Sequence, residues 1–326
     1  MTARNWRKCP IFLCGHRKSG TTLLLSLMDG HDQLCVYPSD SSFFYAYYPR
    51  YAEGEYSEEQ RKKRIIETVY AAMESDAVKW KGECALDMKA LEKRFYERMQ
   101  GKECSPQILL SEAVFAYHDM YGQPREPLAW VEKTTSTEVY ASQVFSWFPN
   151  ARMIQLLRDP RDNFASLKSG WSARYSKRNE DVRDLMQSHL ERAKMAFLMA
   201  SANQELYGEE RYLVLRFEDL VREPESVLQR IAAFAGVRYS DILLQPRFMG
   251  NPWKGNNFDG KVFDRPSAEN VGRWKERITP EEAALIEFHF ADVLDRWEYE
   301  KQLSTSEHVE AASSYYKWSN FRKAIG

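Results

Sequence analysis

The segment from Cys9 to Asp29 reads CPIFLCGHRKSGTTLLLSLMD and places a glycine-containing loop between two apolar runs. The first run, PIFLC, predicts a strand, and the second, TTLLLSLM, predicts a helix. Gly15 and Gly20 allow tight turns in the loop between them, and the N-terminus of a helix favours an anion. The segment therefore predicts a strand, a loop and a helix that together bind a phosphorylated ligand.

The order of residues in this loop differs from the Walker A motif, in which lysine directly follows the second glycine. Here Thr21 follows Gly20, and Lys18 lies two positions before that glycine. K-S-G-T-T in this order resembles the loop with which sulfotransferases bind the 5′-phosphosulfate of 3′-phosphoadenosine 5′-phosphosulfate (PAPS). The resemblance implies that the cofactor is contacted by Arg17, Lys18, Ser19, Gly20, Thr21 and Thr22.

A second segment, ARMIQLLRDPRDNFASLKSGW, extends from Ala151 to Trp171 and resembles another sulfotransferase motif. In that family an arginine at the end of a strand and a serine eight positions later hold the 3′-phosphate of PAPS. Arg158 and Ser166 have this spacing. Two such motifs in the family's order are far more specific than one.

The segment ENVGRWKERIT, Glu269 to Thr279, is similar to the C-terminal region that closes over the nucleotide in the same family. This similarity implies cofactor contacts from Arg273, Trp274 and Lys275. The resemblance extends from about Pro10 to about Tyr299. It is specific for PAPS and its product, 3′-phosphoadenosine 5′-phosphate (PAP), and leaves the acceptor open.

The hydrophobic pattern predicts an α/β fold. Expected strands alternate with helical patterns, which is typical of a parallel sheet with helices on both faces. These strands are Pro10 to Cys14, Leu128 to Glu132, Arg152 to Leu157 and Tyr212 to Arg216; the clearest helices are Glu58 to Glu74 and Asp181 to Leu206. Since no linker divides the chain, residues 1–326 are expected to form a single domain, and the resemblance implies that it has the three-layer sulfotransferase fold.

Charge and cysteine content limit the binding partners and the cellular compartment that we expect for this protein. The net charge of −1 gives no bulk attraction to nucleic acid or anionic membranes. The five cysteines are odd in number and lack C-x-x-C spacing, so neither zinc nor a disulfide framework is expected. Cofactor binding is expected to need no metal, because the loop N–H groups, Lys18, Arg158 and Ser166 neutralise the phosphates directly. The apolar run before Gly15 is too short for a signal peptide or a membrane span, which favours a cytoplasmic protein.

Sulfuryl transfer requires positioning, cations at the departing phosphate and a base near the acceptor. Lys18 is the leading candidate for the first cation. A solvated loop lysine is the alternative for Lys18. Lys133, at the end of an expected strand, is the second cation, since in related sulfotransferases a lysine after this strand approaches the sulfuryl group. Thr134 and Thr135 add hydroxyl donors or cap the following helix.

The general base is the least specific assignment. Sulfotransferases of small phenols and steroids carry a histidine two residues beyond the strand lysine, where this chain has Thr135. The chain is therefore more similar to branches that use a carboxylate, and Asp40 lies about where those branches carry a glutamate. Asp40 alternatively caps a helix, and His31 and His16 are the other candidates for the base.

The acceptor is not specified beyond a hydroxyl or an amine on a small molecule or glycan. Residues 245–266 contain two Gly-Asn pairs and several prolines, which predict a lid or acceptor-contacting loop, or else a surface crossover. An aromatic group after the loop helix lines the acceptor pocket or packs in the core; its members are Tyr37, Phe43, Phe44, Tyr45, Tyr47, Tyr48 and Tyr51. A P-loop kinase and a non-catalytic nucleotide-binding protein are the alternative functions.

Overall fold

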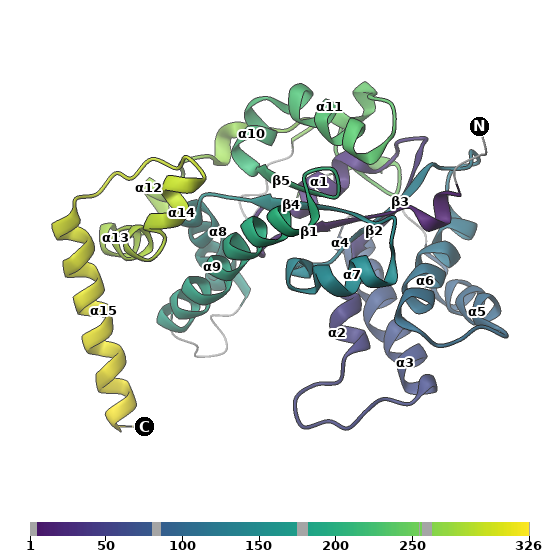
Figure 1. The fold of residues 1–326 in the computed structure, drawn as a ribbon, viewed down its shortest axis with the longest axis horizontal. Coiled ribbons are helices and arrows are strands. Elements are labelled where there is room, and N and C mark those ends of the chain that lie inside the picture. Colours follow the sequence, from purple (N-terminus) through teal and green to yellow (C-terminus); the bar gives the residue numbers. More distant parts are fainter. Residues whose placement is uncertain (1–4, 80–85, 175–181, 254, 256–262, 326) are drawn as a thin grey trace.

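The computed structural model describes residues 5–79, 86–174, 182–253, 255 and 263–325. Its centre is a five-stranded parallel sheet in the order β2-β3-β1-β4-β5 (Figure 1). The strands are β1 Pro10–Cys14, β2 Leu34–Asp40, β3 Ala129–Lys133, β4 Arg152–Leu157 and β5 Tyr212–Arg216. All four predicted strands are confirmed, with β3 shifted by one residue, and β2 is an additional edge strand.

Alternating side chains of the sheet form two separate cores, because successive residues of a strand point to opposite faces. Ile11 and Leu13 pack with one core, whereas Phe12 and Cys14 pack with the other. Helices cover both faces, so the predicted three-layer α/β fold is confirmed (Figure 1).

The helices of the two layers come from different parts of the chain. One face is covered by α1 Thr21–Met28, α10 Phe217–Arg222 and α11 Pro224–Ala235. The other is covered by α6 Pro106–Tyr121, α7 Ala141–Trp147, α8 Pro160–Arg174 and α9 Val182–Tyr207. The helix predicted from Asp181 is α9, and residue 181 itself lies outside the described residues.

Additional helices extend the molecule on either side of the sheet (Figure 1). Near β2 and β3 lie α2 Phe43–Tyr47, α3 Glu58–Ile65, α4 Ala71–Lys79 and α5 Met88–Met99. A π-helical turn, Ile66–Tyr70, joins α3 to α4 within the predicted helix of residues 58–74. The C-terminal part contains α12 Trp274–Arg277, α13 Pro280–His289, α14 Ala291–Arg296 and α15 Thr305–Ile325. No described helix is both long enough and apolar enough to cross a membrane.

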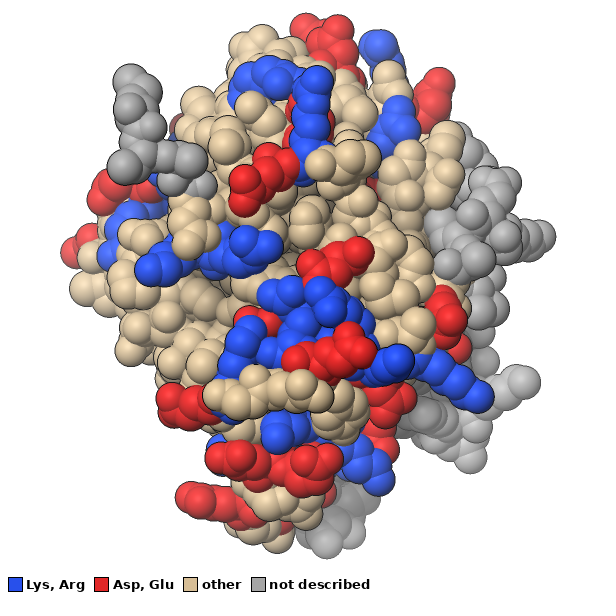
Figure 2. All heavy atoms as spheres, turned by 90° about the vertical axis from the view of Figure 1, so that its right-hand side faces the viewer, with Lys and Arg blue, Asp and Glu red and all other residues tan. Residues whose placement is uncertain are grey.

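The face beside α5 and α6 carries basic and acidic side chains interspersed with one another (Figure 2). Arg98 forms ion pairs with Glu112 at 2.6 Å and with Asp119 at 2.7 Å. Much of the positive charge there is therefore neutralised locally.

The carboxyl ends of the parallel strands meet at one edge of the sheet, where α/β proteins bind ligands. β1 ends at Cys14, directly before the glycine-containing loop, and β4 ends at Leu157, directly before Arg158. Asp40 at the end of β2 pairs in register with Lys133 at the end of β3. The topology thus brings both sulfotransferase-like motifs, the first of which contains Lys18, to the same edge as Lys133 and Asp40.

Candidate active site

A cavity of about 280 Å³ opens at this edge of the sheet. Most of the predicted cofactor and catalytic residues line it: Arg17, Lys18, Gly20, Thr21, Thr22, Lys133, Arg158 and Ser166. Described residues from the segments 17–23, 133–135, 158–166, 246–253 and 263–277 therefore surround one space, although these segments are far apart in sequence.

Two glycines give the loop after β1 its shape. Gly15 has φ +144°, and a Cβ atom there would lie 2.4 Å from the Leu156 carbonyl oxygen. Gly20 has φ +97°, and a Cβ atom there would lie 2.4 Å from Cδ2 of Phe217. Both positions require glycine for close approach as well as for backbone conformation.

Buried polar side chains of Glu138 and Asn163 hold the loop 15–20 in place through hydrogen bonds. The Gly15 N–H donates to Oε2 of Glu138 at 3.1 Å. The side-chain amide of Asn163 donates to the Arg17 carbonyl at 3.0 Å and to Ser19 Oγ at 3.3 Å. The Ser19 side chain is buried and points toward Asn163, so in this structure it supports the loop.

Arg158 extends from the end of β4 into the cavity wall. Its Nη1 donates to the Lys18 carbonyl at 3.0 Å, its Nη2 donates to the Asn270 carbonyl at 3.1 Å, and the guanidinium lies 4.5 Å from the centre of the Phe217 ring. Its buried Nε has no hydrogen-bond partner among the described residues. Arg158 therefore joins the glycine-containing loop to the C-terminal segment and retains an unsatisfied donor, which suits an anion.

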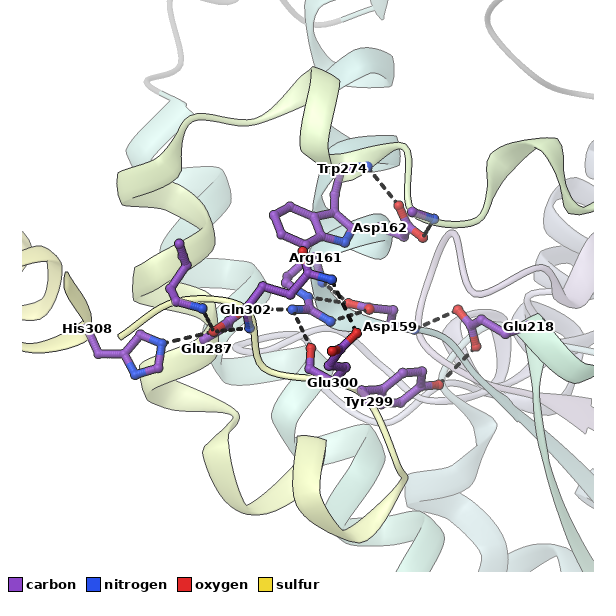
Figure 3. Close-up of polar contacts among 12 residues, drawn as sticks. Asp159, Arg161, Asp162, Glu218, Trp274, Glu287, Tyr299, Glu300, Gln302 and His308 are labelled. Carbon is purple, nitrogen blue, oxygen red and sulfur yellow. Dashed lines mark hydrogen bonds and ion pairs between the residues drawn. The ribbon is translucent and has the colours of Figure 1, made fainter. Parts of the chain in front are cut away.

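The C-terminal segment is attached to α8 through Asp162 (Figure 3). This carboxylate accepts hydrogen bonds from the Gly272 N–H at 2.6 Å and the Trp274 N–H at 2.9 Å. The buried Trp274 ring lies 4.6 Å from the Arg161 guanidinium. Asn270 and Arg277 supply this segment's cavity-lining side chains. Direct cofactor contacts from Arg273, Trp274 and Lys275 stay predictions, since these residues lie beside the lining rather than in it.

A buried ionic network next to Asp162 holds α8 against the C-terminal helices α13 and α15 (Figure 3). Arg161 pairs with Asp159 at 2.7 Å and with Glu287 of α13 at 2.5 Å. Glu287 also accepts a hydrogen bond from His308 of α15 at 2.9 Å. Asp159 receives further support, because its N–H donates to Glu218 at 3.0 Å.

At the other end of the cavity, Lys133 and Asp40 form an ion pair of 2.7 Å between Nζ and Oδ2. Burial alone would raise the pKa of Asp40, but the Lys133 ammonium and hydrogen bonds from Thr135 and Ser42 outweigh burial and hold that pKa below its ordinary value. Asp40 is therefore ionised at neutral pH. This carboxylate is the one that sequence reasoning selected as the base.

The histidine alternatives lie outside the set of residues that line the cavity in the described part of the chain. His16 is buried, and burial lowers its pKa to about 3. His31 is fully buried, and its Nε2 lies 3.0 Å from the Arg238 carbonyl. Neither geometry favours proton abstraction from a bound acceptor.

The aromatic group after the loop helix is mainly a packing cluster. Phe43 and Phe44 are buried, and Phe44 stacks on Tyr140 with ring centres 4.4 Å apart. Tyr45 differs, because half of it is exposed and its hydroxyl donates to the Thr135 carbonyl at 3.1 Å. No member of this group is among the described residues that line the cavity, so contact between these side chains and the acceptor stays a prediction.

Sequence reasoning missed several residues that shape this site. Asn163, Phe217, Asn270 and Arg277 support or line it without belonging to a predicted contact set. Asn163 carried a usable signal, because it precedes Ser166 by three positions on a predicted helix and such residues share a face.

A model of the sulfotransferase family matches residues 10–241, which is most of the chain. The chain belongs to the sulfotransferase family. Carbohydrate sulfotransferase 7 of Mus musculus is 33% identical over 81 residues, which make up 24% of this chain and 16% of that relative. The comparison thus extends over a small part of the mouse protein.

Two solved structures have a similar fold. The sulfotransferase domain from the curacin biosynthetic pathway is 17% identical, with a TM-score of 0.54 over 90% of this chain and 98% of that one. The sulfotransferase domain of the Synechococcus PCC 7002 olefin synthase is also 17% identical, with a TM-score of 0.52 over 90% and 96% of the two chains. At this identity the likeness establishes the fold of this sulfotransferase.

Proposed function

We propose that this sulfotransferase moves the sulfuryl group of PAPS to a hydroxyl or amine of a small-molecule or glycan acceptor. The observation that carries the proposal is the charge of the cavity wall. Its basic side chains are Arg17, Lys18, Lys133, Arg158, Arg265 and Arg277, and no carboxylate is found among the described residues that line it. Such a wall suits a polyanion with phosphate groups at two ends.

The residues present fit PAPS. Arg158 and Ser166 line the cavity together, and the unsatisfied Nε of Arg158 supports binding of the 3′-phosphate there. The loop 15–22 provides a glycine cradle at the N-terminus of α1 for the 5′-phosphosulfate, with Lys18 beside it. In this proposal the 5′-phosphosulfate is also contacted by Arg17, Thr21 and Thr22, which line the cavity, while Ser19 holds the loop through its contact with Asn163.

PAPS supplies an activated sulfuryl group, and the chain supplies charge stabilisation and proton removal. Lys18 stabilises the negative charge that grows on the departing phosphate, and Lys133 stabilises charge on the sulfuryl oxygens. Asp40 is the final acceptor of the proton lost by the attacking group. In this proposal binding and transfer need no metal.

The remaining segments complete the proposal. We propose that residues 1–326 form one domain and that the segment 245–266 contacts the acceptor. In the described part of this segment a small hairpin pairs β6 Arg247–Phe248 with β7 Asn251–Pro252. Pro246, Trp253 and Arg265 of this segment line the cavity. The segment also includes residues 254 and 256–262, which lie outside the described residues. We place the protein in the cytoplasm.

The binding half of the proposal is tested by calorimetry with PAP. PAP should bind at micromolar concentration or below without Mg²⁺, and preference for ATP–Mg²⁺ would favour a kinase instead. Arg158→Ala should weaken PAP binding by about 1.5–3 kcal/mol while barely affecting adenosine 5′-phosphosulfate, which lacks the 3′-phosphate. Arg152→Ala, at the opposite end of the same strand, is the matched control.

The transfer half is tested with [³⁵S]PAPS and a panel of 4-nitrophenol, 1-octanol, N-acetylglucosamine and glucosamine, with water as a further acceptor. Lys18→Ala and Lys133→Ala should each lower kcat more than they raise the KM for PAPS, because the charges that they stabilise grow in the transition state. PAP binding without transfer to any of these acceptors would instead identify a non-catalytic nucleotide-binding protein.

A further inference from the structure

Asp40 contacts the residues of the cavity wall without lining the cavity itself in the described structure. Lys133 and Thr135 both line the cavity, whereas Asp40 is not among the described lining residues. An acceptor in the cavity therefore meets the Lys133 and Thr135 side chains before it meets the carboxylate.

Three donors converge on one oxygen of Asp40. Oδ2 accepts hydrogen bonds from Lys133 Nζ at 2.7 Å, from Thr135 Oγ1 at 2.7 Å and from the Thr135 N–H at 3.3 Å. The other oxygen, Oδ1, accepts from the Ser42 N–H at 3.0 Å and from Ser42 Oγ at 3.2 Å. Both oxygens of the carboxylate thus accept hydrogen bonds from this chain.

Only one of the three donors on Oδ2 is able to accept a proton as well as donate one. An ammonium and a backbone N–H have no acceptor lone pair, whereas a hydroxyl has one donor and two acceptor sites. Thr135 Oγ1 both lines the cavity and donates to Asp40. It is therefore the group of this cluster that connects the cavity to the carboxylate.

We infer that the Thr135 hydroxyl relays the proton of the acceptor to Asp40, an inference that rests on the proposed sulfuryl transfer. As the acceptor oxygen forms its bond to sulfur, the bond between sulfur and the bridging oxygen of PAPS breaks and that electron pair leaves with the phosphate of PAP. The acceptor proton passes to Thr135 Oγ1 while the Thr135 hydroxyl proton passes along its hydrogen bond to Asp40 Oδ2. Asp40 then releases the proton to water.

The ion pair with Lys133 is compatible with this role. Lys133 stabilises the carboxylate as an anion, which makes Asp40 a weak base before reaction. An oxygen that is forming a bond to sulfur becomes strongly acidic, so a weak base suffices for a proton that leaves late. The chain thus combines a cation for the sulfuryl oxygens and a proton acceptor in one cluster.

The relay is tested with Thr135→Val, which keeps the shape of threonine and removes the hydroxyl, and with Thr135→Ser, which keeps the hydroxyl. [³⁵S]Sulfate release from PAPS to water is measured in H₂O and in D₂O. Thr135→Val should lower kcat about 10²-fold, at the lower end of the usual effect of a positioned base, and reduce the solvent isotope effect. Thr135→Ser should retain the isotope effect and most of the rate, and PAP affinity should be the same in both variants.

Ser42→Ala is the matched control, because Ser42 Oγ also donates to Asp40 but does not line the cavity in the described structure. Its kcat should remain close to that of the wild type. Undiminished turnover and an unchanged isotope effect in Thr135→Val would overturn the relay while leaving sulfuryl transfer intact. A wild-type protein that binds PAP but transfers to neither the acceptor panel nor water would overturn the proposed function, and the relay with it.

Discussion

At position 20 the chain requires glycine, because a Cβ atom would contact the Phe217 ring and the backbone is left-handed. Gly20→Ala should lower the free energy of unfolding by roughly 1–3 kcal/mol and weaken PAP binding, since the loop must move away from Phe217. Gly101→Ala is a control with φ +68° and no described atom within 4 Å of the added Cβ. Equal effects in the two variants, by denaturation and calorimetry, would show that backbone strain alone matters.

Glu138, which accepts a hydrogen bond from the Gly15 N–H, makes the free energy of unfolding depend on pH. Burial raises the pKa of Glu138 from 4.5 to about 7, so the folded state holds a proton that the unfolded state loses. This contribution to stability is therefore complete below pH 4.5 and is lost as the pH rises through about 7, by about 3 kcal/mol at most. Glu138→Gln keeps an acceptor for the Gly15 N–H and removes the titration.

Urea denaturation between pH 4.5 and 8 measures this effect. The wild-type free energy of unfolding should fall more steeply with pH than that of Glu138→Gln. Parallel curves for the two proteins would contradict a titrating Glu138.

The residues that sequence reasoning found are those that a ligand would contact, and the ones it missed act on other side chains. Lys18, Arg158 and Ser166 belong to recognisable spacings, and the structure brings all three to one cavity. Asn163 supports the loop through contacts between residues far apart in sequence, which a single sequence does not display. The hydrogen bond from Thr135 to Asp40 likewise joins residues far apart in sequence, so it was not predictable before the fold was known.

Among the elements, strand β2 shows where the hydrophobic pattern failed. LCVYPSD contains Pro38 and ends in polar residues, which reads as a loop. Because β2 is an edge strand, a proline is tolerated there, and its register with β3 shifts between Val36 and Asp40. The other four strands are mostly apolar and almost entirely buried, and they were predicted closely because burial on both faces leaves a strong signal.

The segment 270–277 depends on one side chain of α8 for its position. Asp162 accepts hydrogen bonds from the Gly272 and Trp274 N–H groups. Asp162→Ala removes both acceptors, so Asn270 and Arg277 should lose their places in the cavity wall and PAP affinity should fall about 10-fold or more, about 1.4 kcal/mol.

Lys168→Gln is the control for this prediction on the same helix. It breaks the ion pair with Glu282 at 2.7 Å, which joins α8 to α13 and not to the segment 270–277. Calorimetry should show near-normal PAP binding in this variant. Equal weakening by both changes would mean that general loosening of α8, rather than the tether, controls affinity.

At the scale of the whole molecule, the phosphate motif after β4 is joined to the C-terminal helices through buried charges. Arg161 contacts Asp159 and Glu287, and Glu287 contacts His308 of α15 (Figure 3). The side chains that follow Arg158 in sequence therefore belong to the interface that holds α13 and α15. Stability of the C-terminal part and geometry at the cavity are expected to change together.

Glu287→Gln tests this connection. Glu287 is fully buried, and hydrogen bonds from His308, Gln302 and Leu303 together with the Arg161 charge outweigh burial and hold its pKa below the ordinary value. Its contribution is therefore present above pH 4.5 and is lost as the pH falls through the folded-state pKa. Removing the charge leaves a buried Arg161 with one carboxylate fewer, which should cost about 3–5 kcal/mol of unfolding free energy at neutral pH. Asp295→Asn breaks only the exposed pair with Lys301 and should cost little, so similar denaturation midpoints for the two variants would contradict a central role for the buried network.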